Sequence, residues 1–125
     1  MMKKIPIYAL LFTLLSSFWV NPEEEIIKAL KSGEAAGVAQ YFDNTVQISL
    51  PDKSGSYSKK QATLVLRDFF SATQIKDFQV LHQSENTESE YLIGNLVTQG
   101  GPYRTTIFIR KIAGKELIQE LRFEK

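Results

Sequence analysis

The chain has no cysteine and only one histidine, His82, among its 125 residues. Without cysteine it has neither a disulfide nor a thiol nucleophile, and a single histidine does not supply the common zinc-ligand spacings. The sequence also lacks a glycine-rich phosphate-binding loop. It therefore carries none of the strongest signals of catalysis, and we expect neither a metal nor a cofactor.

The sequence also has no excess of positive or negative charge. The 15 Lys and Arg residues are balanced by 14 Asp and Glu residues, and the formal net charge is +1. The basic side chains are dispersed, whereas binding to a phosphate backbone requires a basic patch or stripe. We therefore expect no nucleic-acid binding. The content of 43% hydrophobic and 23% charged residues is typical of one small globular domain with a single core.

The chain has one long apolar run, at its start. Lys3 and Lys4 precede a nearly uninterrupted apolar stretch from residue 5 to residue 20, which is the pattern of an export signal. A membrane-spanning helix needs about 20 apolar residues, so this stretch is short for a permanent span. We expect a signal peptide over residues 1–20 and an exported mature domain, periplasmic or extracellular, over residues 21–125. An uncleaved anchor stays open, because residues 16–20 make a poor cleavage region.

Three segments have the signature of helices. "NPEEEIIKALKSG" predicts a helix that begins after the N-cap Asn21 and ends at Gly33. "EAAGVAQYF", residues 34–42, predicts a second, short amphipathic helix. "SKKQ", residues 58–61, is a capping box that opens a third helix. This third helix has the widest apolar face of the chain, made of Ala62, Val65, Leu66, Phe69 and Phe70.

The remaining segments alternate with the period of strands. "TVQISL", residues 45–50, predicts a strand, and the turn residues of "PDKSGS", residues 51–56, predict a hairpin. Four further runs follow, separated by loops too short for parallel crossovers, and we expect an antiparallel meander over residues 76–83, 90–99, 103–112 and 116–124. Three glutamates at the junction of the first two runs, the last of which also begins the second run, are expected in a solvated loop: Glu85, Glu88 and Glu90.

This order of elements, α-α-β-β-α-β-β-β-β, resembles the nuclear transport factor 2-like (cystatin-like) α+β cone. More closely, "YFDNTVQISL", "YSKKQATLVLRDFF", "EYLIGNLVTQGGPYRTTIFIRK" and "LIQELRFE" are similar to an uncharacterised family of small exported bacterial domains in that superfamily. The resemblance implies three helices packed on a curved, mainly antiparallel sheet, with a pocket at the open end of the cone. It implies no activity, because this fold carries enzymes, adaptors and domains without catalysis.

Strand parity predicts which side chains would line such a pocket. His82 shares a face with Phe78 and Val80, since alternate residues of a strand point to the same side. Tyr103 falls in one row with Thr105, Ile107 and Ile109, and Gln119 in one row with Leu117, Leu121 and Phe123. With Tyr57 before the third helix, the candidate ligand-binding residues are His82, Tyr57, Tyr103 and Gln119. Asn95 joins them only if Tyr91, Ile93 and Val97 also face inward.

Three functions remain open for this fold. The leading hypothesis is an exported, non-enzymatic domain that binds a small apolar ligand or a protein partner at the cone mouth or the sheet face. The first alternative is a small cofactor-independent enzyme, of isomerase, dehydratase or hydrolase type, with a pocket around His82. The second is a structural module that forms a homodimer through the sheet, with Phe108 in the interface. We assign no catalytic residue.

Overall fold

The computed structural model describes residues 21–125 of the chain. The predicted signal peptide lies outside the described residues and stays a prediction. The elements follow one another as α2 (Pro22–Ser32), α3 (Ala35–Ala39), β1 (Phe42–Leu50), β2 (Lys53–Ser58), α4 (Lys59–Thr73), β3 (Ile75–Glu85), β4 (Ser89–Thr98), β5 (Gly101–Ile112) and β6 (Lys115–Glu124).

The two longer helices begin where their capping residues predict. In α2 the side-chain oxygen of Asn21 accepts a hydrogen bond from the backbone N–H of Glu23 at 3.0 Å. At the start of α4 the N–H of Gln61 donates to the Ser58 hydroxyl at 3.2 Å, and the N–H of Ser58 donates to the Gln61 side chain at 3.4 Å. These bonds satisfy backbone donors that a helix leaves free at its first turn, and both predicted starts are confirmed.

Two predicted boundaries are wrong. The second helix ends at Ala39, and Phe42 already begins β1, where its buried ring packs in the core as part of the sheet. The predicted turn over residues 51–56 is also too long, because β2 starts at Lys53. In both places pairing with a neighbouring strand supplies backbone hydrogen bonds that local sequence preferences do not anticipate.

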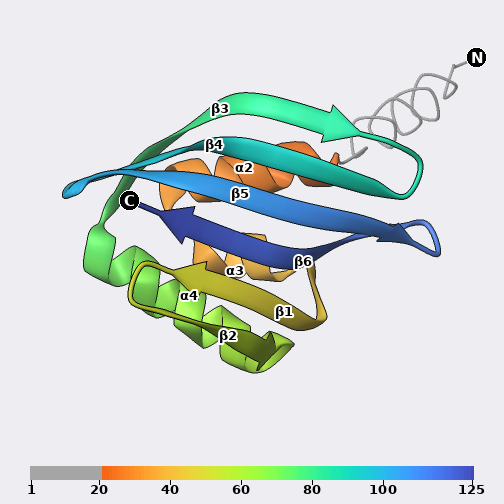
Figure 1. Cartoon of the computed structure of the whole chain (residues 1–125), viewed down its shortest axis with the longest axis horizontal. Helices are drawn as coiled ribbons and strands as arrows, with labels where there is room; N and C mark the ends of the chain where they lie inside the picture. Colours follow the sequence, from red (N-terminus) through yellow and green to blue (C-terminus); the bar gives the residue numbers. More distant parts are fainter. Residues whose placement is uncertain (1–20) are drawn as a thin grey trace, which may run out of the picture.

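The strands form one mixed sheet in the order β2-β1-β6-β5-β4-β3. Neighbouring strands are antiparallel except β1 and β6, which are parallel. In Figure 1 the three described helices lie behind the sheet, on one of its sides. We call the side covered by the helices the inner face and the opposite side the outer face.

The core fills the space between the inner face and the helices. The apolar face predicted for α4 is confirmed, since Ala62, Leu66, Phe69 and Phe70 are buried. The Phe69 ring lies 4.8 Å from the ring of Phe123 and 5.2 Å from that of Tyr103, between centroids. Buried side chains of the sheet complete the core, among them Val46, Ile48, Phe78, Leu92, Leu96, Ile107, Ile109, Ile118 and Leu121.

Irregular pairing in two strands changes which residues face the core. In β3 the pairing with β4 shifts between Val80 and His82, so that Leu81 is an extra residue. In β6 the pairing with β5 shifts so that Gln119 is the extra residue between Ile118 and Glu120. Each β-bulge reverses the alternation of side chains beyond it, which decides where two of the predicted site residues point.

Candidate functional site

His82 lies on the outer face, and the prediction that it shares a face with Phe78 and Val80 is wrong. It pairs with Ile93 of β4, whereas Val80 pairs with Gly94 in the inner row. Directly paired residues of antiparallel strands point to the same side, so the bulge at Leu81 turns the imidazole outward. The His82 side chain is exposed and makes no hydrogen bond to another residue within the range 21–125.

Gln119 also fails to face inward, and Ile118 takes the buried position instead. Its side-chain amide donates a hydrogen bond of 2.6 Å to the Asp43 carboxylate on β1. This bond, with a second one from the backbone N–H of Asn44, lowers the pKa of the Asp43 carboxyl below its ordinary value. Gln119 borders a shallow cleft of about 350 Å³ on the outer face, next to Phe108 and Arg110.

The two predicted tyrosines do point to the inner side, at different ends of the core. Tyr103 is buried in one row with Thr105, Ile107 and Ile109, as parity predicted. Its ring is T-shaped against Phe69, and the Lys125 ammonium lies 5.5 Å from the ring centroid. Tyr57 is half-buried on β2, where it packs against the core beside Gly55.

The fold does not bring the four predicted residues together. His82 and Tyr57 belong to β3 and β2, the two edge strands of the six-stranded sheet. Five strand spacings of about 4.8 Å separate these edges, roughly 24 Å along the sheet. The inner face between them is covered by buried apolar side chains, including Leu66, Ile107 and Leu121, which have no exposed surface. A common pocket around His82 therefore does not form.

The outer face carries an aromatic pair, of which one ring is exposed and the other partly buried. Tyr91 of β4 and Phe108 of β5 are directly paired, and their ring centroids lie 4.8 Å apart. The Tyr91 side chain is 46% exposed, although Tyr91 lies in a paired strand rather than in a loop. Asn95 belongs to the same outward row, together with Tyr91, Ile93 and Val97, so the condition for placing it in an interior pocket is not met.

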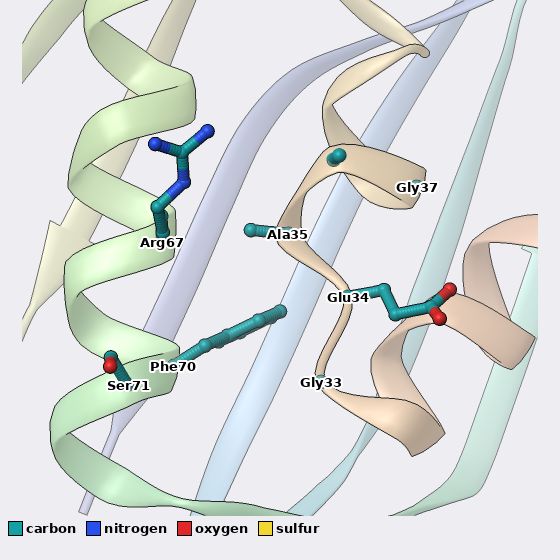
Figure 2. Close-up of a pocket in the computed structure, with 8 residues that line it drawn as sticks. Gly33, Glu34, Ala35, Gly37, Arg67, Phe70 and Ser71 are labelled. Carbon is teal, nitrogen blue, oxygen red and sulfur yellow. The ribbon is translucent and has the colours of Figure 1, made fainter.

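A larger cleft lies between α4 and the segment that joins α2 to α3. Its volume is about 480 Å³, within the size range of small-molecule sites. The side chains of Phe70 on α4 and Ala35 at the start of α3 face one another across it, and Arg67 extends along the same side of α4 (Figure 2). Sequence analysis missed this cleft, because its two walls are about 30 residues apart in the chain and Arg67 looks like an ordinary solvated residue.

Carboxylates gather where α2 begins. Burial raises the pKa of the Glu23 carboxyl, and the negative charges of Glu85 and Glu116 act in the same direction, against a hydrogen bond with Gln83.

Glu90, predicted in a solvated loop, instead lies in β4 and is 2% exposed. Its Oε1 atom has no hydrogen-bond partner. The alternation of Glu90 with the buried Leu92 and Leu96 was the signal that could have placed it in the strand.

Two further findings concern the described residues as a whole. Within residues 21–125, no three histidine or acidic side chains are grouped so that they could bind a metal ion. No helix in that range is long and apolar enough to cross a membrane.

Comparison with known proteins places the chain in a family. Residues 23–124 match the model of the domain of unknown function DUF4783. A DUF4783 protein from Bacteroides uniformis is 32% identical in sequence with a TM-score of 0.81, and the match covers 84% of this chain and 97% of that one. A second, from Bacteroides ovatus, is 30% identical with a TM-score of 0.78, covering 81% and 92%. A search of curated proteins found no match.

More distant structures confirm the predicted fold. A nuclear transport factor 2-like protein of unknown function from Cytophaga hutchinsonii has a TM-score of 0.60 at 13% identity, over 84% of this chain and 89% of that one. At this identity the likeness concerns the fold alone. The family match extends over nearly all of the described residues. The chain therefore belongs to the DUF4783 family and has the nuclear transport factor 2-like, or cystatin-like, α+β fold.

Proposed function

We propose that this protein is an exported, non-enzymatic binding domain that associates with a second copy of itself through the outer face of its sheet. The observation that carries the proposal is the aromatic pair on that face, in which Tyr91 is 46% exposed and Phe108 is partly buried. Aromatic side chains are enriched at protein interfaces, since they bury a large area at a small entropic cost. An enzyme is not favoured, because His82 lacks the interior position on which that alternative depended.

The outer face is large enough for a dimer. Six strands about 4.8 Å apart, on average about ten residues long at about 3.3 Å per residue, make a face of roughly 29 by 33 Å, or about 950 Å². A stable interface buries about 800 Å² on each partner. Ile93 and Val97 extend the apolar surface around the aromatic pair, and Arg104, Arg110 and Arg122 supply polar groups on the same face.

The oligomeric state of the mature domain tests this interface. We expect residues 21–125 to be dimeric by size-exclusion chromatography with light scattering, and the double variant Tyr91→Ser, Phe108→Ser to be monomeric. Leu64→Ser is the matched control, since this side chain on α4 is 49% exposed but lies away from the sheet face. A wild-type domain that stays monomeric at about 100 µM, or a double variant that stays dimeric, would contradict the proposal.

Export is supported by Lys3, Lys4 and the apolar run that follows them. Expression of the full chain in a bacterial host tests it. Protein recovered outside the cytoplasm should begin near Asn21 when its N-terminus is sequenced. Soluble cytoplasmic protein with an intact Met1 would refute export.

A further inference from the structure

One row of directly paired side chains crosses the outer face from β2 to β4. Ser56 of β2 pairs with Gln47 of β1, and Gln47 pairs with Glu120 of β6. Glu120 in turn pairs with Phe108 of β5, which pairs with Tyr91 of β4. Directly paired residues of neighbouring strands point to the same side of the sheet. The row therefore changes from polar side chains to aromatic rings between Glu120 and Phe108.

The outer-face cleft of about 350 Å³ lies at this change. None of the side chains that line it is buried, so a ligand can reach all of them. Apart from the Phe108 ring, every one of them can form hydrogen bonds: Thr45, Gln47, Ser56, Arg110, Gln119 and Glu120. Hydroxyl and amide groups both donate and accept, whereas a carboxylate accepts and a guanidinium donates. The lining therefore suits a ligand with many donors and acceptors rather than an apolar one.

The charges at this cleft are balanced. Glu120 forms an ion pair of 2.9 Å with Arg122. The pKa of the Asp43 carboxyl is lowered by its hydrogen bond with Gln119 and, to a smaller extent, by the positive charge of Arg110. Each charged side chain at the cleft thus has an opposite charge nearby, which favours a neutral ligand over an ion. The bond to Asp43 also holds the Gln119 amide in place, and the carbonyl oxygen of that amide can accept another hydrogen bond.

The Phe108 ring gives the cleft one apolar border. Tyr91 lies against this ring from the β4 side, with the two ring planes 34° apart. The polar lining comes mainly from β1, β2 and β6, which are on the opposite side of β5. Phe108 is only partly buried, so the part of its ring that Tyr91 does not cover borders the cleft. The face of an aromatic ring carries partial negative charge and attracts polarised C–H groups.

We propose that this cleft binds a neutral saccharide, which places the C–H face of one sugar ring on Phe108 and forms hydrogen bonds from its hydroxyls to Gln47 and Gln119. A saccharide combines the properties that the lining requires, since it has no net charge, hydroxyls that donate and accept, and an apolar ring face. A purely apolar ligand would instead leave the polar side chains without partners. The site adjoins the interface proposed for self-association and shares Phe108 with it, so a bound saccharide and a second copy should exclude one another there.

Three neutral hexasaccharides are the probes for this site: maltohexaose, cellohexaose and xylohexaose. Each is titrated into isotope-labelled residues 21–125 and followed by amide NMR spectra. We expect saturable shifts with at least one of them, centred on Gln47, Ser56 and Gln119. Gln47→Ala should weaken this binding about threefold to tenfold, the loss expected for one neutral hydrogen bond. Gln79→Ala is the matched control, because Gln79 is also exposed on the outer face but lies on β3, away from the cleft.

Two further measurements separate the ring contact from the hydrogen bonds. Phe108→Leu keeps an apolar side chain but removes the aromatic face, and it should weaken binding about threefold or more. Sorbitol, which has hydroxyls but no sugar ring, should produce weaker shifts than the best hexasaccharide. Absence of saturable shifts with all three hexasaccharides up to about 10 mM, shifts centred elsewhere, or equal affinity in wild type and both cleft variants would overturn the proposal.

Tyr91→Ser separates this proposal from self-association. Tyr91 does not line the cleft, and its replacement should weaken the contact between two copies. The titrations are therefore repeated with this variant at a concentration at which light scattering shows a monomer, so that a second copy cannot cover the cleft. A dimeric wild type whose Tyr91→Ser variant binds none of the hexasaccharides would refute the saccharide site alone. A wild type that is monomeric throughout and binds one of them would refute self-association alone.

Discussion

Gly94 in the inner row of β4 lies directly against the neighbouring strand β3. The buried Phe78 ring of β3 crosses over it, so that a Cβ atom on residue 94 would lie 2.5 Å from Cζ of Phe78. The same atom would lie 2.6 Å from the backbone carbonyl oxygen of Gln79. Both distances are far below van der Waals contact, and the second involves backbone that cannot rotate away. Gly94→Ala must therefore displace β3 as well as the ring.

The expected cost follows from two opposing effects. Overpacking a core position by one methyl group costs about 1–3 kcal/mol. Replacing glycine by alanine also restricts the unfolded chain, which offsets about 0.4–1 kcal/mol of this loss. We therefore expect Gly94→Ala to lower the free energy of unfolding by about 1–2 kcal/mol and the melting temperature by about 5 °C or more.

Urea unfolding of residues 21–125, followed by circular dichroism, measures this change. Gly100→Ala is the matched control, since a Cβ atom at Gly100 meets nothing within 4 Å, and its stability should stay within about 0.5 kcal/mol of wild type. Phe78→Leu removes the ring but leaves the carbonyl of Gln79 in place. Combined with Gly94→Ala, it should lose less stability than the sum of the single losses, by about 0.5–1 kcal/mol. A Gly94→Ala variant as stable as wild type would refute the argument from close contact.

Three further predictions concern single side chains. Phe69→Ala should lower the free energy of unfolding by about 3–5 kcal/mol, because it empties a buried position in the core. Leu64→Ala, on the exposed side of the same helix, should lower it by at most about 0.5 kcal/mol. Similar losses for the two variants in urea titrations would contradict the assigned core. Glu90→Leu should raise the free energy of unfolding by about 1–3 kcal/mol, because it removes a buried oxygen without a hydrogen-bond partner. A destabilised variant would show that this carboxylate has a stabilising contact. Gln119→Ala should raise the pKa of Asp43 towards its ordinary value in an NMR titration. Because the folded-state pKa of Asp43 is lowered, this bond stabilises the fold at pH values above the ordinary pKa, and the stabilisation disappears as the pH falls through the folded-state pKa. The free energies of unfolding of wild type and Gln119→Ala should therefore converge in acid. An unchanged pKa of Asp43 in the variant would contradict the role of the bond.

Local signals in the sequence determined the elements and much of the core. The capping residues Asn21, Ser58 and Gln61 act within one turn of their own helix, so the starts of α2 and α4 could be read without tertiary information. The period of the apolar residues likewise predicted the buried face of α4 and the inward row of β5, where Ile107 and Ile109 alternate without interruption. The order of these elements was enough to indicate the nuclear transport factor 2-like fold.

Only the tertiary structure decided which way the candidate site residues point. Counting alternate residues works along a regular strand, but Leu81 and Gln119 are bulges, and a bulge is a property of the pairing between two strands rather than of either one. One extra residue was enough to turn His82 to the outer face and to pair Gln119 with Asp43. The cleft beside Arg67 depends in the same way on how closely α3 approaches α2 and α4, a distance set by packing between segments that are remote in the chain.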